Sequence, residues 1–156
     1  MEAFDGLDTD LKCVIVGDAP YAEAYISDLK DKAGPNVIFT GYLFGEGYYE
    51  LGSNAYIFVE TSEVGGTHPA LVEAMAFGNC VVVNGTEENR ESIGDAGLYY
   101  DGTRGAAALR PLLQRLLDDP TLVAEYRQRA KERVAVEYDW ESITDHYEAL
   151  FRSLCQ

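Results

Sequence analysis

Positive charge is scarce in this sequence and unevenly placed. The 156 residues include 12 Lys and Arg against 27 Asp and Glu, which gives a formal net charge of −15. Lysine occurs only at positions 12, 30, 32 and 131, and residues 34–88 contain neither lysine nor arginine. Because basic side chains that neutralise phosphates provide much of the affinity for nucleic acid, we expect no nucleic-acid partner. An anionic ligand of the central segment would be held by backbone amides, by a helix N-terminus or by basic residues from elsewhere.

Long apolar runs are also missing. No run approaches the roughly 20 residues that a transmembrane helix needs, and residues 1–5 lack the basic and then apolar order of a signal peptide. The three cysteines are an odd number, and Cys13 and Cys80 lie in apolar stretches, which favours buried thiols over disulfides. These absences predict a cytoplasmic protein with no transmembrane segment. Two distant histidines and three scattered cysteines give no metal-ligand spacing, so we expect no metal site.

The sequence does contain the material for one folded domain, because 47% of its residues are hydrophobic. Short apolar runs alternate with helical patterns, and we expect strands at 11–16, 37–40, 55–59, 80–83 and 97–100. The expected helices are 22–33, 47–51, 68–77, 88–93, 105–117, 120–136 and 141–154. Trp140 is expected to pack at the last helix junction. This order predicts the α/β class, with a doubly wound, Rossmann-like parallel sheet, C-terminal helices and a single domain over residues 1–156.

Ligands of doubly wound sheets bind beyond the carboxyl ends of the strands, which places the candidate site in loops 17–20, 41–45, 61–67 and 84–88. Two other proteins of this topology are disfavoured. A response-regulator receiver needs an acceptor Asp at the end of the third strand, but residues 59–61 are Val-Glu-Thr. A dinucleotide-binding fold needs Gly-x-Gly-x-x-Gly after the first strand, and residues 17–21 do not have that pattern.

Residues 63–78 pass from a strand end through paired glycines into a helix. Thr67 is the expected N-cap, and Pro69 suits the first turn. Glycines allow a ligand to approach the backbone closely, and the free amides of a first helical turn favour a phosphate. The carboxylate of Glu73 can accept two hydroxyl hydrogen bonds, as from a ribose or sugar diol. On these residues alone, a tight connection followed by a solvated glutamate explains the pattern equally well.

The stretch from Glu73 to Val83, Glu-Ala-Met-Ala-Phe-Gly-Asn-Cys-Val-Val-Val, resembles the donor-site signature of family 4 retaining glycosyltransferases with the GT-B fold. The likeness continues in order through residues 14–20, 37–42, 89–91, 94–98 and 140–154. Residues 65–69, Gly-Gly-Thr-His-Pro, are most similar to a rhamnosyltransferase-like branch. The resemblance implies the C-terminal, donor-binding half of a GT-B fold, with a nucleoside-diphosphate sugar as donor substrate and no cofactor.

The resemblance also assigns roles by position. Glu73 matches the glutamate that holds the nucleotide ribose, and Tyr42 and Leu43 match the loop beside the base. The implied donor-binding residues are Gly17, Tyr42, Leu43, Gly65, Gly66, Thr67, His68, Pro69 and Glu73. The first carboxylate of the signature would stand eight residues before Glu73, where this chain has Gly65. Glu63 is the candidate to replace it in catalysis, or is only a loop acid, and the catalytic residues are otherwise unassigned. His68 is expected to donate to a phosphate or sugar hydroxyl, or to cap the turn.

Family members carry an Arg and a Lys that stabilise the leaving diphosphate, and an N-terminal Rossmann domain that contacts the acceptor. The expected place of both is upstream of Met1. We therefore expect the full-length enzyme to transfer a hexosyl or deoxyhexosyl group to a glycan or lipid-linked acceptor in polysaccharide biosynthesis, as a peripheral protein of the inner membrane face. This chain alone is expected to be inactive.

The sequence leaves two alternatives to this enzyme. One is a stand-alone nucleotide-sugar-binding or interaction domain without turnover. Nucleotide-sugar 2-epimerases are the other, because they share the GT-B architecture, but the sequence contains no catalytic-acid pattern for them.

Overall fold

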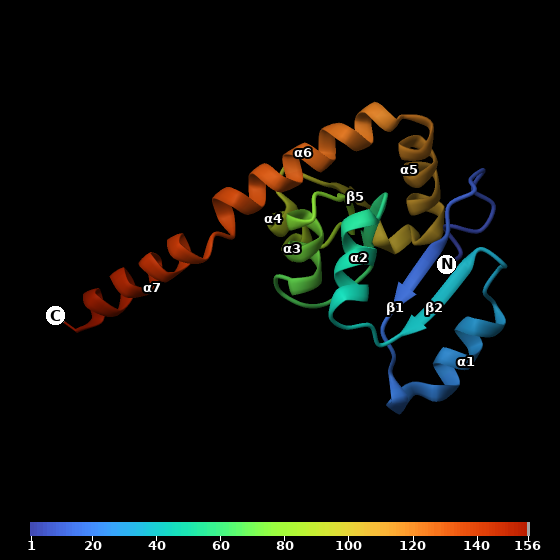
Figure 1. Ribbon diagram of the computed structural model, residues 1–156, viewed down its shortest axis with the longest axis horizontal. Coiled ribbons are helices and arrows are strands. Elements are labelled where there is room, and N and C mark those ends of the chain that lie inside the picture. The colour runs from blue at the N-terminus through green and yellow to red at the C-terminus, as the bar shows by residue number, and fades with distance from the viewer. Residues whose placement is uncertain (156) are drawn as a thin grey trace.

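The computed structural model describes residues 1–155, and the described part is an α/β structure (Figure 1). The strands are β1 (Cys13–Val16), β2 (Val37–Gly41), β3 (Ile57–Glu60), β4 (Cys80–Asn84) and β5 (Leu98–Tyr100). The α-helices are α1 (Glu23–Asp31), α2 (Glu46–Asn54), α3 (Pro69–Ala76), α4 (Glu87–Ile93), α5 (Ala106–Asp118), α6 (Pro120–Glu137) and α7 (Trp140–Leu154). Short 3-10 helices occur at η1 (Pro20–Ala22) and η2 (Gly102–Arg104).

The strands are parallel but form two separate sheets. β1 pairs with β2, and in the second sheet β4 lies between β3 and β5. The predicted α/β class with parallel strands is confirmed. The single continuous sheet is not found, because no ladder joins β1 to β3 within residues 1–155. Neither strand of the first sheet contains a buried residue, so this sheet lies outside the buried core.

Strand β4 is the centre of the hydrophobic core, and all five of its residues are buried. Cys80 and Val82 belong to a cluster with residues of α5 and α6. Val81 and Val83 belong to a second cluster with residues of α3, α4 and α6. Because successive side chains of a strand point to opposite faces, this one strand packs against helices on both of its faces. The expected doubly wound packing is therefore present around β4.

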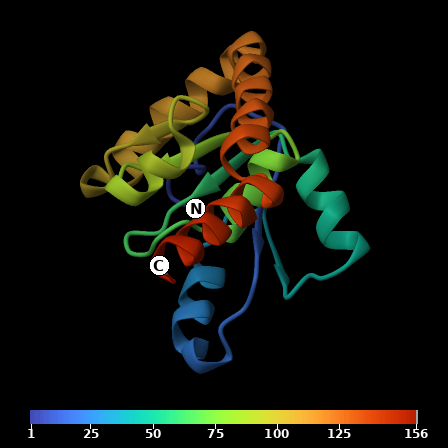
Figure 2. The same cartoon turned by 90° about the vertical axis from the view of Figure 1, so that its left-hand side faces the viewer.

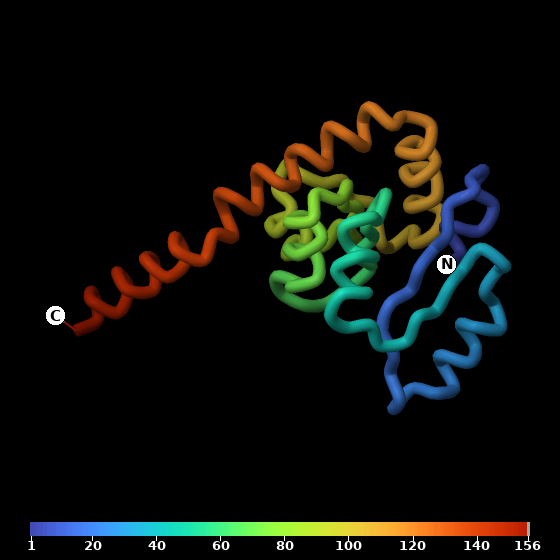
Figure 3. The backbone as a smooth tube through the Cα atoms, in the orientation of Figure 1, coloured from blue at the N-terminus to red at the C-terminus, as the bar shows by residue number. Residues whose placement is uncertain are grey.

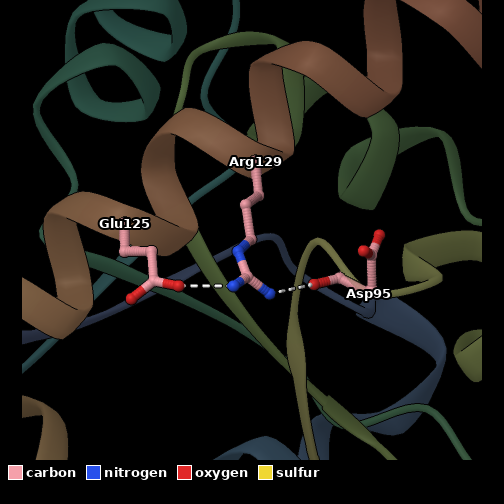
Figure 4. Close-up of polar contacts among 3 residues, drawn as sticks. All are labelled: Asp95, Glu125 and Arg129. Carbon is pink, nitrogen blue, oxygen red and sulfur yellow. Dashed lines mark hydrogen bonds and ion pairs between the residues drawn. The ribbon is translucent and has the colours of Figure 1, made fainter.

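Helix α6 is held against α4 by arginines that donate to backbone carbonyls at and just after the end of α4. Nε of Arg133 donates to the carbonyl of Ser92 at 2.7 Å. Nη1 of Arg129 donates to the carbonyl of Asp95 at 3.4 Å, and Arg129 also forms an ion pair with Glu125 on its own helix (Figure 4). Carbonyls at a helix C-terminus lack intrahelical partners and carry partial negative charge, so the guanidinium groups stabilise this end of α4.

The first sheet and the last helix contribute little to the core. Helices α1, α2 and α7 have no buried residue. In both ribbon views α6 lies at the top of the molecule and α1 at the bottom (Figure 1, Figure 2). The backbone trace shows α7 continuing past the end of α6 and away from the rest of the molecule (Figure 3). Trp140, the first residue of α7, is 80% exposed, so its predicted packing role is wrong.

The other sequence expectations for the fold hold with small shifts. Each expected strand and α-helix is present with ends moved by at most three residues, the largest shift being the longer α2. Cys13, Cys80 and Cys155 are free thiols; Cys80 is fully buried, as expected, but Cys13 is only partly buried, because β1 lies outside the core. Burial raises the pKa of the Cys80 thiol to about 12. No helix within residues 1–155 is long and apolar enough to cross a bilayer.

Leucine side chains on α5 and α7 differ widely in burial, and this difference predicts how much each one contributes to the free energy of unfolding. Leu116→Ala on α5 removes a side chain with no exposed surface, and we expect the free energy of unfolding to fall by about 2–5 kcal/mol. Leu154→Ala on α7 is the matched control: its side chain is 74% exposed, and the expected change is within about 0.5 kcal/mol. Equilibrium urea unfolding measures both, and equal losses would contradict the burial described above.

Candidate functional site

The loop after β3 leads directly into α3 and contains most of the predicted site. Pro69 is the first residue of α3, as expected, but the N-cap is His68 and not Thr67. A residue before proline is driven to extended backbone, and His68 has φ −84° and ψ 117°. Its carbonyl accepts hydrogen bonds from the amides of Leu71 and Val72 at 3.0 and 3.2 Å. The His68 side chain makes no cap hydrogen bond. Pro69 has no amide proton, so within residues 1–155 the Ala70 amide is the one in this first turn that has no described partner and is available to an anion.

Gly65 and His68 pack closely within this loop. Gly65 has φ +146°, a conformation that other residues rarely adopt. A Cβ atom at position 65 would lie 2.7 Å from Cε1 and 3.0 Å from Nε2 of His68. The imidazole ring therefore occupies the space that a side chain at position 65 would need. Gly66 differs, because a Cβ atom there would meet no atom within 4 Å. Gly65, Gly66 and Thr67 are all exposed.

Glu73 is exposed on α3, and its carboxylate is in contact with α2. The hydroxyl of Tyr48 donates a hydrogen bond to Oε2 of Glu73 at 2.5 Å. This hydrogen bond, together with partial burial and the charge of Glu73, raises the pKa of Tyr48 to about 12. The phenol is therefore protonated at neutral pH and acts as a donor. In the sequence Tyr48 is one of several tyrosines with no distinguishing pattern, so its contact with Glu73 was missed.

Asn84, the last residue of β4, and Asn89, on α4, anchor the start of the β3–α3 loop. Nδ2 of Asn84 donates to the carbonyl of Ser62 at 3.2 Å, and Nδ2 of Asn89 donates to the same carbonyl at 3.3 Å. The amide and hydroxyl of Ser62 donate to Oε1 of Glu60 at 2.9 and 2.6 Å. Sequence reasoning gave neither asparagine a role. The available signal was a polar residue, Asn84, directly after three buried valines at the carboxyl edge.

Gly17, Tyr42 and Leu43 lie around the end of the first sheet. The amide of Gly17, which has φ +118°, donates to the carbonyl of Gly41 at 2.9 Å. The exposed ring of Tyr42 stacks on that of Phe44, with centroids 6.0 Å apart and an interplanar angle of 18°. Leu43 packs against the first turn of α2. These residues present an exposed aromatic surface beside the helix that carries Tyr48.

Two charged side chains border the candidate site near β5. Glu63 is exposed. The pKa of Tyr100 on β5 is raised mainly by burial of the phenol, and the negative charges of Glu60 and Glu63 raise it further. The guanidinium of Arg90, on α4, lies 4.0 Å from the ring centroid of Tyr99 on β5. Residues 34–88 contain no lysine or arginine, and Arg90 is the first basic residue after them in the sequence. Its guanidinium lies near Gly85, directly after the carboxyl end of β4.

The candidate site is an open surface. A hollow of about 370 Å³ lies beside η1 and α1, but none of the predicted donor-binding residues lines it. Within residues 1–155 no group of three or more His, Cys, Asp or Glu side chains is placed to hold a metal ion. The described chemistry of this face consists of backbone amides, the Glu73 carboxylate, His68 and exposed tyrosines.

The arrangement of parallel strands and a long C-terminal helix is that of the C-terminal domain of a GT-B fold. The sequence profile described as "Glycosyl transferases group 1" matches residues 1–119. The chain belongs to this glycosyltransferase family, which confirms the family resemblance seen in the sequence. No match was found among curated proteins.

Solved structures share this fold. Sucrose-phosphate synthase from Thermosynechococcus elongatus is 26% identical, with a TM-score of 0.78 over 90% of this chain and 38% of its own. Anabaena HepE in complex with UDP is 18% identical, with a TM-score of 0.87 over 97% of this chain and 43% of its own. The C-terminal domain of a Francisella tularensis glycosyl transferase group 1 family protein is 20% identical, with a TM-score of 0.71 over 83% of this chain and 70% of its own. The chain thus spans less than half the length of the first two.

The contact between Gly65 and His68 predicts a local effect of substitution. We expect Gly65→Ala to displace the His68 ring, because the added methyl group would lie 2.7 Å from Cε1. The NMR resonance of the His68 Cε1 proton should shift clearly, while that of His146 on α7 stays in place. Gly66→Ala is the control, since its methyl group meets open space. Equal shifts of His68 in the two variants would contradict this geometry.

Proposed function

We propose that this chain is the donor-binding domain of a retaining glycosyltransferase that uses a nucleoside-diphosphate sugar. The observation that carries the proposal is membership of the glycosyltransferase group 1 family over residues 1–119, a range that includes Glu73 and the whole β3–α3 loop. Anabaena HepE, which has the same fold, was solved with UDP and with UDP-glucose. These complexes support a nucleotide sugar as the ligand class for this chain.

Each part of the ligand has a matching group on the candidate site. In this proposal the Glu73 carboxylate accepts hydrogen bonds from the two ribose hydroxyls. The Ala70 amide at the start of α3 and the amides of residues 65–68 stabilise the diphosphate, helped by the helix dipole. His68 donates to a phosphate or sugar hydroxyl, and Tyr42 lies beside the base. Such fixed donors also stabilise the negative charge that develops on the leaving diphosphate during transfer.

The rest of the reaction depends on parts of the enzyme outside this chain. We propose that an N-terminal domain binds a glycan or lipid-linked acceptor and supplies basic residues to the diphosphate, since residues 34–88 have none. The isolated chain would then bind the donor without transferring the sugar. Neither a cofactor nor a metal is part of this proposal. The rhamnosyltransferase-like branch and the role of Glu63 as a catalytic carboxylate are hypotheses of the same kind.

A stand-alone nucleotide-sugar-binding domain without turnover is the second candidate. It uses the same site, and the lack of positive charge in residues 34–88 favours it over a complete active site in this chain. Transfer assays on a form of the protein extended upstream distinguish the two, because only the enzyme would gain activity.

Isothermal titration of the chain with UDP, GDP and dTDP tests the proposal. We expect one nucleotide to bind above the others, and Glu73→Ala to weaken that binding by about 10-fold or more, because two hydrogen bonds to a carboxylate are lost. Titrations at low and high salt separate specific binding from the effect of the net charge of −15.

Glu132→Ala provides the matched control, since it removes the same charge from an exposed position on α6. Its affinity for the nucleotide should equal that of the wild type. Equal binding by wild type and Glu73→Ala would remove the ribose role of Glu73. Absence of binding by the folded wild-type chain at both salt concentrations would count against a preformed donor site.

A further inference from the structure

Tyr48 and Glu73 come from different helices and meet at the exposed face of α3. Tyr48 lies in the first turn of α2, and its hydroxyl is 2.5 Å from Oε2 of Glu73. An ionised carboxylate has about four lone-pair sites, and a phenol has one proton to donate. The hydrogen bond therefore occupies one site on Oε2 and leaves Oε1 free for a ligand.

The position of Tyr48 is set by a close contact between α2 and the end of α3. A Cβ atom at Gly52 of α2 would lie 2.6 Å from Cε2 of Phe77, so only glycine permits this approach. Nδ2 of the buried Asn79 donates to the carbonyl of Gly52 at 2.9 Å. The ring of Tyr48 packs edge-on against Phe77, with centroids 6.4 Å apart. These contacts hold the phenol where it reaches Glu73.

An exposed glutamate without such a contact samples several rotamers, and ordering it on binding costs affinity. A donor fixed to one carboxylate oxygen reduces that freedom before the ligand arrives. The aromatic packing beneath Tyr48 keeps this donor in place without covering Glu73, which is exposed.

We infer that Tyr48 is a positioning residue for the donor site: it orients the Glu73 carboxylate so that the free oxygen faces the vicinal diol of the nucleotide ribose. The inference rests on the proposed function, because it requires Glu73 to bind the ribose. Tyr48 acts through Glu73 and does not touch the nucleotide.

The test compares a ribonucleoside diphosphate with its 2′,3′-dideoxy analogue, each titrated calorimetrically into the wild-type chain and into Tyr48→Phe. We use UDP and 2′,3′-dideoxy-UDP, or the corresponding pair for the base that the chain prefers. Tyr48→Phe should weaken binding of the ribonucleotide about fivefold and leave binding of the dideoxy analogue unchanged. In a Glu73→Ala background the same substitution should have no further effect.

Tyr49→Phe is the matched control, because Tyr49 packs in the same aromatic cluster and its hydroxyl has no hydrogen-bond partner within residues 1–155. It should bind both nucleotides like the wild type. Ribonucleotide binding that depends on Glu73 but is equal in wild type and Tyr48→Phe would overturn this inference and leave the proposed function standing. Equal weakening of both nucleotides by Tyr48→Phe would show a purely structural role. Failure of the wild-type chain to bind any nucleotide would overturn the proposed function and this inference together.

Discussion

Burial of β4 on both faces is the constraint on which the rest of the structure depends. Its alternating side chains join α5 and α6 on one face to α3 and α4 on the other, so a single five-residue strand connects both hydrophobic clusters. Helix α3, which starts the candidate site, is held by this packing through Leu71 and Met75, both with no exposed surface. Because the inner face of α3 is fixed in the core, its outer face presents Glu73 in a defined place.

Hydrogen bonds near the carboxyl end of β4 connect the buried core to the loop of the candidate site. Asn84 and Asn89 donate to one carbonyl, that of Ser62, at the start of the β3–α3 loop. Both asparagines are nearly or fully buried, and a buried amide that lost its partner would be costly. At the other end of the loop, Pro69 makes His68 extended and fixes where the helix begins. The glycine-rich loop between them is therefore held at both ends while its middle stays open to a ligand.

The sequence predicted most of the element positions and the parallel α/β class because both follow from local patterns. Hydrophobic periodicity, proline at a helix start and glycine after a strand act over a few residues. Where the structure differs, the deciding factor is not local. Thr67 has good capping chemistry, yet the backbone restriction before Pro69 makes His68 the N-cap. Trp140 has the residue type of a core anchor, yet α7 runs away from the body and leaves it exposed.

By itself, the sequence determined the fold class and the family, since these depend on the order of residues along the chain. Only the tertiary structure decided that Tyr48 contacts Glu73, that the His68 ring fills the space beside Gly65, and that the first sheet is separate from the second. Each of these depends on how closely two segments approach in space. The contact between Tyr48 and Glu73, for example, depends on the approach of the Phe77 ring to the backbone of Gly52, residues far apart in sequence, which no local pattern encodes.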